Sequence, residues 1–205
     1  MTNSSRLVYP LASSQISRAE KTLADAFDAD RMAIYFFPCA ATRHAGLRRI
    51  FRVGLHYGLR YGRVDTIHEG AAVAIWLRSE YATASLSRMA RTGMLTVPFA
   101  VGWGAIRRIL SFLHFIEAER LRAISSPHWY LLNIAACPDR QGQGLGATLL
   151  RHGMTRAQEQ GIPCYLETTN ERNVAFYEKH GFRVTRPAQA PNGGPSVWGM
   201  LAPNP

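Results

Sequence analysis

One stretch of the chain constrains its fold more than any other, because an apolar run, a glycine-rich loop and a helix follow one another directly. Residues 129–137 read WYLLNIAAC and stop before a proline, which predicts a strand buried on both faces. The loop QGQGLG at 141–146 leads straight into a helix predicted over 145–160, which Gly161 and Pro163 end. This succession of strand, loop and helix predicts an α/β fold.

Apolar spacing and turn residues predict the other elements. Helices are expected at 16–29, 46–61, 106–124 and 171–180, and strands at 6–11, 63–68, 71–78, 164–168, 182–187 and 195–201. The strands 63–68 and 71–78 form a hairpin that turns at Glu69-Gly70, and residues 36–39 form a loop. Gly181 followed by Phe182 predicts a Schellman cap at the end of helix 171–180.

Residues 79–126 interrupt the alternation and are mostly helical. The length of 205 residues fits one domain over 1–205, so this segment is interpreted as a helical insertion. For helix 106–124 itself, packing against the core is the simplest role. A pocket wall or a dimer contact is the alternative.

Composition excludes several classes of protein. The net charge is +10, but 22 of the 24 basic residues are arginines spread along the chain, so a dedicated nucleic-acid surface is disfavoured. An anionic small ligand would use the same positive field. Three scattered cysteines, Cys39, Cys137 and Cys164, do not suit a disulfide framework or a zinc site. With no apolar run long enough for a membrane span and no signal-peptide pattern, a cytoplasmic protein without a metal is expected.

The glycines of the loop, Gly142, Gly144 and Gly146, indicate an anion site. Backbone N–H groups can point outward around a pyrophosphate, and the following helix adds its positive N-terminal end. A dinucleotide-binding turn is the competing interpretation, since Glu167 stands 21 residues after Gly146. The G-x-G-x-G spacing departs from that fingerprint, and only 38 residues follow Glu167, too few for a doubly wound sheet.

Two segments resemble the signatures of the GNAT N-acetyltransferase superfamily. IAACPDRQGQGLGATLL (134–150) resembles its acetyl-CoA loop, Gln/Arg-x-x-Gly-x-Gly/Ala, and NERNVAFYEKHGF (170–182) resembles its second signature. Further segments are similar to the puromycin N-acetyltransferase branch of the superfamily: KTLADAF (21–27), GAAVAIW (70–76), HWYL (128–131) and GPSVWGM (194–200). The similarity is weakest over 30–60 and 79–126, where that family shapes its acceptor pocket. The resemblance therefore implies that the insertion 79–126 forms a wall of this pocket.

The resemblance implies a mixed α/β fold: a twisted central sheet with flanking helices, whose middle strands, 129–137 and 164–168, are splayed to admit acetyl-CoA. The residues that it assigns to acetyl-CoA are Ile134, Ala135 and Ala136 along the pantetheine arm, Gln141, Gly142, Gln143, Gly144, Leu145, Gly146 and Ala147 around the pyrophosphate, and Asn173 on the later helix.

By the same resemblance, Tyr177 is the general acid that protonates the departing CoA thiolate. A core tyrosine is the alternative role. Asn170 is expected to cap the helix that carries it. The general base stays open between Glu167, His128 and a water chain. Acetyl moves directly to a primary amine of a small molecule, with no covalent intermediate on a cysteine.

Two other functions remain open from the sequence. One is a non-catalytic acyl-CoA sensor on the same fold, and the other is a basic nucleic-acid-binding module. The chain is expected to act as a monomer or a homodimer.

Overall fold

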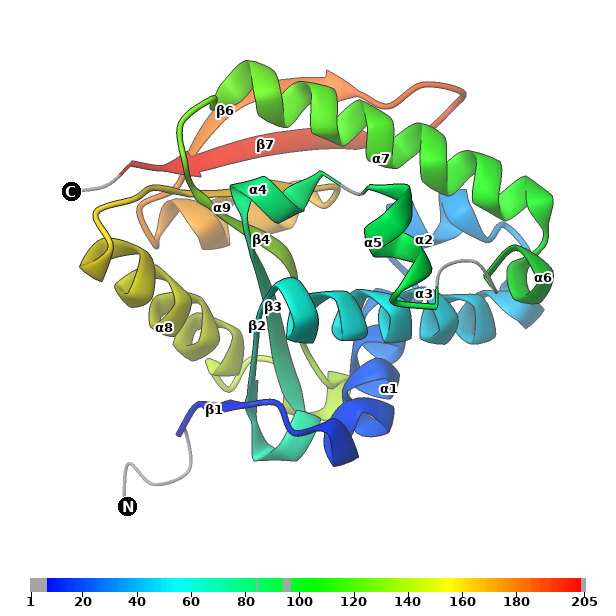
Figure 1. Ribbon diagram of the computed structural model, residues 1–205, viewed down its shortest axis with the longest axis horizontal. Coiled ribbons are helices and arrows are strands. Elements are labelled where there is room, and N and C mark those ends of the chain that lie inside the picture. Colours follow the sequence, from blue (N-terminus) through cyan, green and yellow to red (C-terminus); the bar gives the residue numbers. More distant parts are fainter. Residues whose placement is uncertain (1–6, 84, 94–96, 204–205) are drawn as a thin grey trace.

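The computed structural model describes residues 7–83, 85–93 and 97–203. Within these residues the strands form a seven-stranded sheet in the order β1-β2-β3-β4-β5-β7-β6 (Figure 1). The strands are β1 (Tyr9–Pro10), β2 (Gly62–Ile67), β3 (Ala72–Arg78), β4 (Trp129–Ala136), β5 (Cys164–Thr168), β6 (Arg183–Gln189) and β7 (Ser196–Ala202). Only the central pair β4/β5 is parallel, and all other neighbours are antiparallel. The predicted mixed sheet is confirmed.

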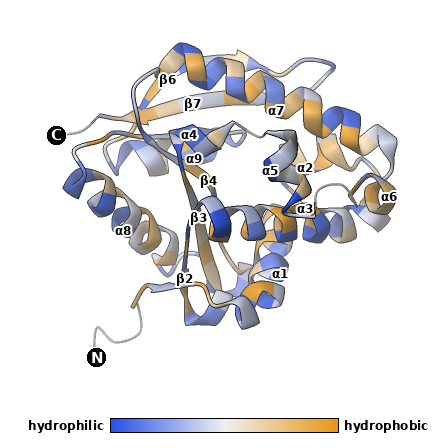
Figure 2. Ribbon diagram, in the orientation of Figure 1, coloured by the Kyte–Doolittle hydropathy of each residue, from blue (hydrophilic) through white to orange (hydrophobic). Residues whose placement is uncertain are grey.

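Helices cover both faces of this sheet. They are α1 (Ile16–Phe27), α2 (Arg31–Phe36), α3 (Ala40–Tyr61), α4 (Ser79–Ala82), α5 (Leu86–Ala90), α6 (Val97–Val101), α7 (Trp103–Ala123), α8 (Leu145–Glu159) and α9 (Glu171–Glu178). Figure 2 shows that the long helices α3, α7 and α8 carry hydrophobic and hydrophilic residues on different sides. No helix among the described residues is long and apolar enough to cross a membrane.

The alternation of side chains along β3 separates two cores. Val73 and Ile75 point to one face, where they pack with residues of α1, α3 and α7. Ala72, Ala74 and Trp76 point to the other face, where they pack with residues of α8 and α9. Successive residues of a strand face opposite sides, so this one strand joins two helical layers through the sheet.

Close approach of α8 to the sheet depends on a glycine. A Cβ on Gly153 would lie 2.3 Å from the indole of Trp76, which is fully buried. Any larger residue at this position would push the helix away from β3.

The central strands part after a short paired stretch. Strand β4 pairs with β5 only from Trp129 to Leu131, although β4 continues to Ala136. The predicted splay is therefore confirmed. The expectation that this strand is buried on both faces is wrong for its second half. Residues 132–136 are only partly buried, because no strand among the described residues pairs with that edge.

Other predictions need correction near the N-terminus. The expected loop at 36–39 is preceded by helix α2, whose N-cap Asp30 accepts a hydrogen bond from the Met32 N–H at 2.8 Å. Helix α3 begins at Ala40 rather than 46, just after Pro38. The first strand is shorter than 6–11, and the expected residue 6 lies outside the described residues.

Candidate active site

The glycine-rich loop has the geometry of an anion site. Gly142 and Gly144 adopt positive φ angles of 76° and 78°, a conformation that favours glycine. Gly144 is the N-cap of α8, whose first turn leaves backbone N–H groups without helical acceptors. Gln141 donates a hydrogen bond from Nε2 to the Ala136 carbonyl at 3.2 Å, which ties the loop to the end of β4.

The free edge of β4 lies beside this loop. Ile134, Ala135 and Ala136 pair with β3 on one side, and β5 has already ended its pairing on the other. The three residues are partly buried. An extended ligand that carries amide groups could therefore add to this edge as an extra strand would.

Helix α9 presents Tyr177 to the interior. Asn170 caps the helix as expected, accepting from the Arg172 N–H at 3.1 Å. The Schellman cap is confirmed, since Phe182 N–H donates to the Tyr177 carbonyl at 3.2 Å and Gly181 N–H to Glu178 at 3.0 Å. These two caps fix where α9 begins and ends.

The Tyr177 side chain is almost fully buried, with 6% of its surface exposed. Its ring packs against Phe176 and Phe182. Burial raises the pKa of the Tyr177 phenol well above its ordinary value, so the hydroxyl keeps its proton throughout the neutral range. Tyr177 and Asn173 line one cavity, as the shared helix face predicts.

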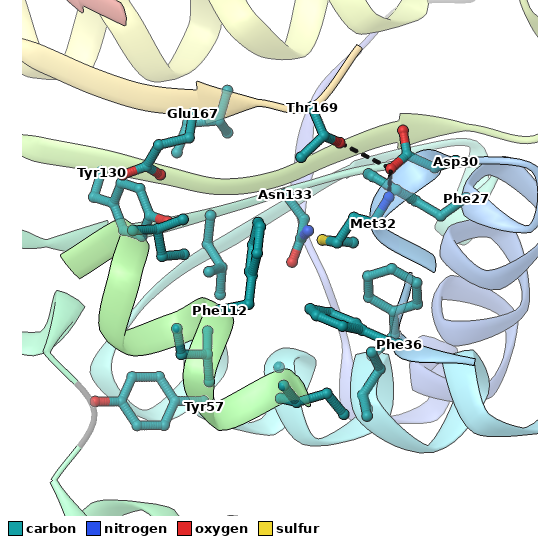
Figure 3. A pocket seen from close by; sticks show the side chains of 18 of the residues that line it. Phe27, Asp30, Met32, Phe36, Tyr57, Phe112, Tyr130, Asn133, Glu167 and Thr169 are labelled. Atoms are coloured by element: carbon teal, nitrogen blue, oxygen red, sulfur yellow. Dashed lines mark hydrogen bonds between the residues drawn. The ribbon is translucent and has the colours of Figure 1, made fainter. Parts of the chain in front are cut away.

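This cavity lies between the parted strands and helices α3 and α7, with a volume of about 250 Å³. Figure 3 shows its two sides. Tyr130, Asn133 and Glu167 lie along the strands, with Asp30 and Thr169 beyond them. The side chains that face them from the helices are apolar or aromatic, including Phe36, Phe112 and Tyr57.

Glu167 lies where β5 leaves β4, one residue after the last paired residue, Leu166. Burial raises the pKa of its carboxyl to about 7, although the nearby Tyr130 and Tyr165 hydroxyls and the Arg120 charge favour the ionised form. Among the described residues, its Oε1 has no hydrogen-bond partner. A carboxyl with this pKa exchanges protons readily near neutral pH.

His128, the other candidate base, does not lie near the cleft, and that expectation is wrong. It precedes β4 at the closed end, where Trp129 pairs with Cys164, and it is not among the residues that line the cavity. Its Nδ1 bonds the Ser126 carbonyl at 2.7 Å and its Nε2 lies 3.4 Å from Arg120. Burial lowers the pKa of His128.

Sequence reasoning missed several residues that shape the cavity. Asn133 is one of them. It is the lone polar residue within the apolar run 129–137, and this could have marked it as a cavity residue. Asp30 is another. Its Oδ1 accepts from Thr169 Oγ1 at 2.9 Å and so links the start of α2 to the end of β5 across the cavity.

Two cysteines lie on or next to the central strands, Cys164 at the start of β5 and Cys137 just after β4. Cys137 and Cys164 are not among the described residues that line the cavity. Burial raises the pKa of both thiols, that of Cys164 to about 12. Neither has the low pKa that a nucleophilic thiolate requires.

The sheet parts beside a glycine-rich helix N-terminus and opens onto a cavity lined by a phenol and a carboxyl. The Acetyltransferase (GNAT) family model matches residues 74–182, just over half of the chain, and the chain belongs to this family.

Relatives agree with this assignment. An uncharacterised N-acetyltransferase of Schizosaccharomyces pombe is 24% identical over 173 residues, which cover 80% of this chain and 69% of that protein. The structure of a histone acetyltransferase HPA2 and related acetyltransferase from Corynebacterium glutamicum matches with a TM-score of 0.69 and 22% identity, covering 98% of this chain and 97% of the other. Arylalkylamine N-acetyltransferase 2 from Aedes aegypti matches with a TM-score of 0.60 and 10% identity, over 95% of this chain and 97% of the other. The two structures share the fold.

Proposed function

We propose that this protein transfers acetyl from acetyl-CoA directly to the primary amine of a small molecule, with Tyr177 as general acid and Glu167 as general base. The observation that carries the proposal is the parting of β4 from β5 after Leu131, which leaves a free edge of β4 whose Ile134 lines the same cavity as Tyr177 and Glu167. The motif similarity noted above supports a place in the puromycin N-acetyltransferase-like branch.

The proposed acetyl-CoA site fits the residues present. The pyrophosphate would accept hydrogen bonds from backbone N–H groups of residues 141–147, where the first turn of α8 has donors to spare. The pantetheine arm would pair with Ile134, Ala135 and Ala136, whose outer edge no strand of the described chain occupies. Asn173, exposed at the cavity wall, would contact the same arm.

The chemical step needs one proton acceptor and one proton donor. Glu167 takes a proton from the incoming ammonium group, so that the amine nitrogen can attack the thioester carbonyl carbon. The new C–N bond forms as the C–S bond breaks, and Tyr177 gives its proton to the departing thiolate. The second proton on nitrogen leaves to solvent, Glu167 releases its proton to solvent, and Tyr177 takes a proton back from solvent. The products are the amide, the CoA thiol and one net proton.

The two pKa values suit these roles. Burial raises the pKa of Glu167 to about 7, so the carboxylate and the carboxylic acid are both populated under neutral conditions. The phenol of Tyr177 stays protonated there because burial raises its pKa. Acid–base catalysis requires such a pair, in which the surroundings keep one group as the proton acceptor and the other as the proton donor.

Other parts of the chain support the proposal. Residues of the segment 79–126, including Ile106, Ile109 and Phe112, line the cavity, which supports its role as the acceptor-pocket wall of a single domain. The three cysteines are unpaired, in keeping with a reducing cytoplasm.

A panel of amines tests the proposal, with release of the CoA thiol as the readout. Wild-type protein should release CoA from acetyl-CoA in the presence of at least one primary amine, and mass spectrometry should find the acetylated amine. Calorimetry should show that acetyl-CoA binds. Binding of acetyl-CoA with no transfer to any amine would favour the sensor function instead.

A further inference from the structure

The helical side of the cavity is apolar and rich in aromatic rings. Four phenylalanines from four helices meet there, and aliphatic residues of α7 fill the spaces between them. The rings belong to Phe27, Phe36, Phe51 and Phe112. The Phe36 and Phe112 rings meet edge to face with centroids 5.3 Å apart. Such a wall binds a flat, uncharged body well.

Charge is confined to the strand side. Asp30 and Glu167 are the only acidic residues among those described that line the cavity. Asp30 already caps α2 and accepts from Thr169 through the same oxygen, Oδ1. Glu167 keeps an oxygen without a partner in the described chain. Both carboxyls therefore belong to the strand side of the cavity, and none of the described residues that line its phenylalanine end is acidic.

The size of the cavity limits the ligand. An apolar cavity of about 150 Å³ is enough for benzene. The present volume of about 250 Å³ leaves room for one ring and a chain of a few atoms that ends in an amine.

We infer, on the basis of the proposed function, that the acceptor is an arylalkylamine: a primary amine on a short chain that carries one uncharged aromatic ring. The ring lies between α3 and α7 among the phenylalanines, and the amine points to Glu167 on the strand side. A diamine or a basic peptide would have to leave its second cation in the apolar end, which is costly without a partner. The net charge of +10 also disfavours approach of such polycations.

A substrate comparison gives the first test. Phenethylamine carries an aromatic ring, cadaverine carries a second amine, and ethylamine has neither. The value of kcat/KM should be highest for phenethylamine, by about 10- to 100-fold over either of the others. A preference for cadaverine would overturn the inference.

Gly54 offers a variant that fills the cavity without breaking the fold. It lies in α3 and lines the cavity, and the nearest atom to a Cβ built there is Ile75 Cδ1, 4.0 Å away. Leucine is also a better helix residue than glycine. In Gly54→Leu the new side chain should occupy the place of the ring.

The matched control is Gly104→Leu. Gly104 lies exposed in α7, and its Cβ would meet only the Arg108 guanidinium, 3.7 Å away. This variant also replaces a helical glycine with leucine, at a position that does not line the cavity. Gly104→Leu should keep wild-type kinetics with all three amines.

In Gly54→Leu, kcat/KM for phenethylamine should fall by about 100-fold, whereas that for ethylamine should change by less than about threefold. Calorimetric binding of phenethylamine should be lost in parallel, while acetyl-CoA affinity stays. Unchanged phenethylamine kinetics and binding in Gly54→Leu would overturn the inference.

The binding measurement also separates this inference from the proposed reaction. Phenethylamine that binds in wild type and not in Gly54→Leu supports the assignment of the cavity, even if no CoA is released, in which case the reaction itself is contradicted. Turnover of cadaverine with no binding of phenethylamine would support the reaction and contradict the acceptor class.

Discussion

Replacing Glu167 with glutamine removes one ionisable group from the cavity and keeps the size of the side chain. In the wild type, burial raises the pKa of this carboxyl to about 7. A general base must be ionised to accept a proton, so kcat/KM should rise with pH and level off above that value. In Glu167→Gln, kcat should fall by roughly 100-fold, within the usual range for general-base catalysis, and the rise near neutral pH should disappear.

The same carboxyl links stability to pH. When the chain is unfolded, its pKa returns to the ordinary value of 4.5, so between that value and about 7 the folded state binds more protons. The free energy of unfolding therefore falls as pH rises through this window. A pKa rise of this size corresponds to about 3 kcal/mol of folding stability. The protein has this stability in full below pH 4.5 and has lost it above about pH 7.

In Glu167→Gln the free energy of unfolding should not fall in this way as pH rises. Glutamine resembles the protonated acid, so the variant and the wild type should have similar stability at about pH 4, and the variant should be more stable by up to about 3 kcal/mol at about pH 8. Urea unfolding at the two pH values measures the difference directly.

Glu159→Gln is the control, because Glu159 is exposed at the end of α8. This variant should behave as wild type in both assays. A wild-type kcat/KM that stays flat across the neutral range, or a Glu167→Gln variant with full activity, would refute the assignment of Glu167 as the base.

Three further variants test the remaining assignments. Tyr177→Phe keeps the ring packing and should lower kcat by about 10- to 100-fold with acetyl-CoA affinity unchanged; full activity in steady-state assays would end the general-acid role. Gly144→Asp places a side chain and a negative charge at a φ of 78° and should weaken acetyl-CoA binding in calorimetry by more than about tenfold; unchanged affinity would remove the loop from the site. Cys137→Ser should retain kcat, because direct transfer needs no thiol, and loss of activity together with an acetylated Cys137 in wild type by mass spectrometry would contradict direct transfer.

Local features of the sequence were sufficient to predict the glycine loop and the helix that carries Tyr177. Gly142 and Gly144 adopt positive φ angles, and Asn170 and the Gly181-Phe182 pair cap α9 as their residue types require. Such preferences act over a few residues of chain, so they can be read without knowing the fold. A weaker signal of the same kind, Asp30 as the N-cap of α2, was missed and left a helix unpredicted.

The choice between His128 and Glu167 depended on strand pairing. His128 directly precedes β4, and Glu167 lies near the end of β5. The sequence alone gives no reason to prefer one of them as the base. The parallel register that pairs Trp129 with Cys164 closes one end of the strand pair and opens the other. His128 falls at the closed end and Glu167 at the open end. Register is set by contacts across the whole sheet, so it is invisible in a segment of sequence.

The cavity itself is decided only by the tertiary structure. Phe36 and Phe112 lie 76 positions apart in the sequence, and neither stands in a local pattern that marks its side chain as part of a cavity. Whether such side chains fill a core or leave a cavity depends on how the helices that carry them pack against the parted strands. The raised pKa of Glu167 has the same origin, because burial is a property of everything that surrounds the carboxyl. The sequence therefore determined the backbone geometry of the loop that we propose for acetyl-CoA, and long-range packing determined the volume, the charge and the proton affinity of the proposed acceptor cavity.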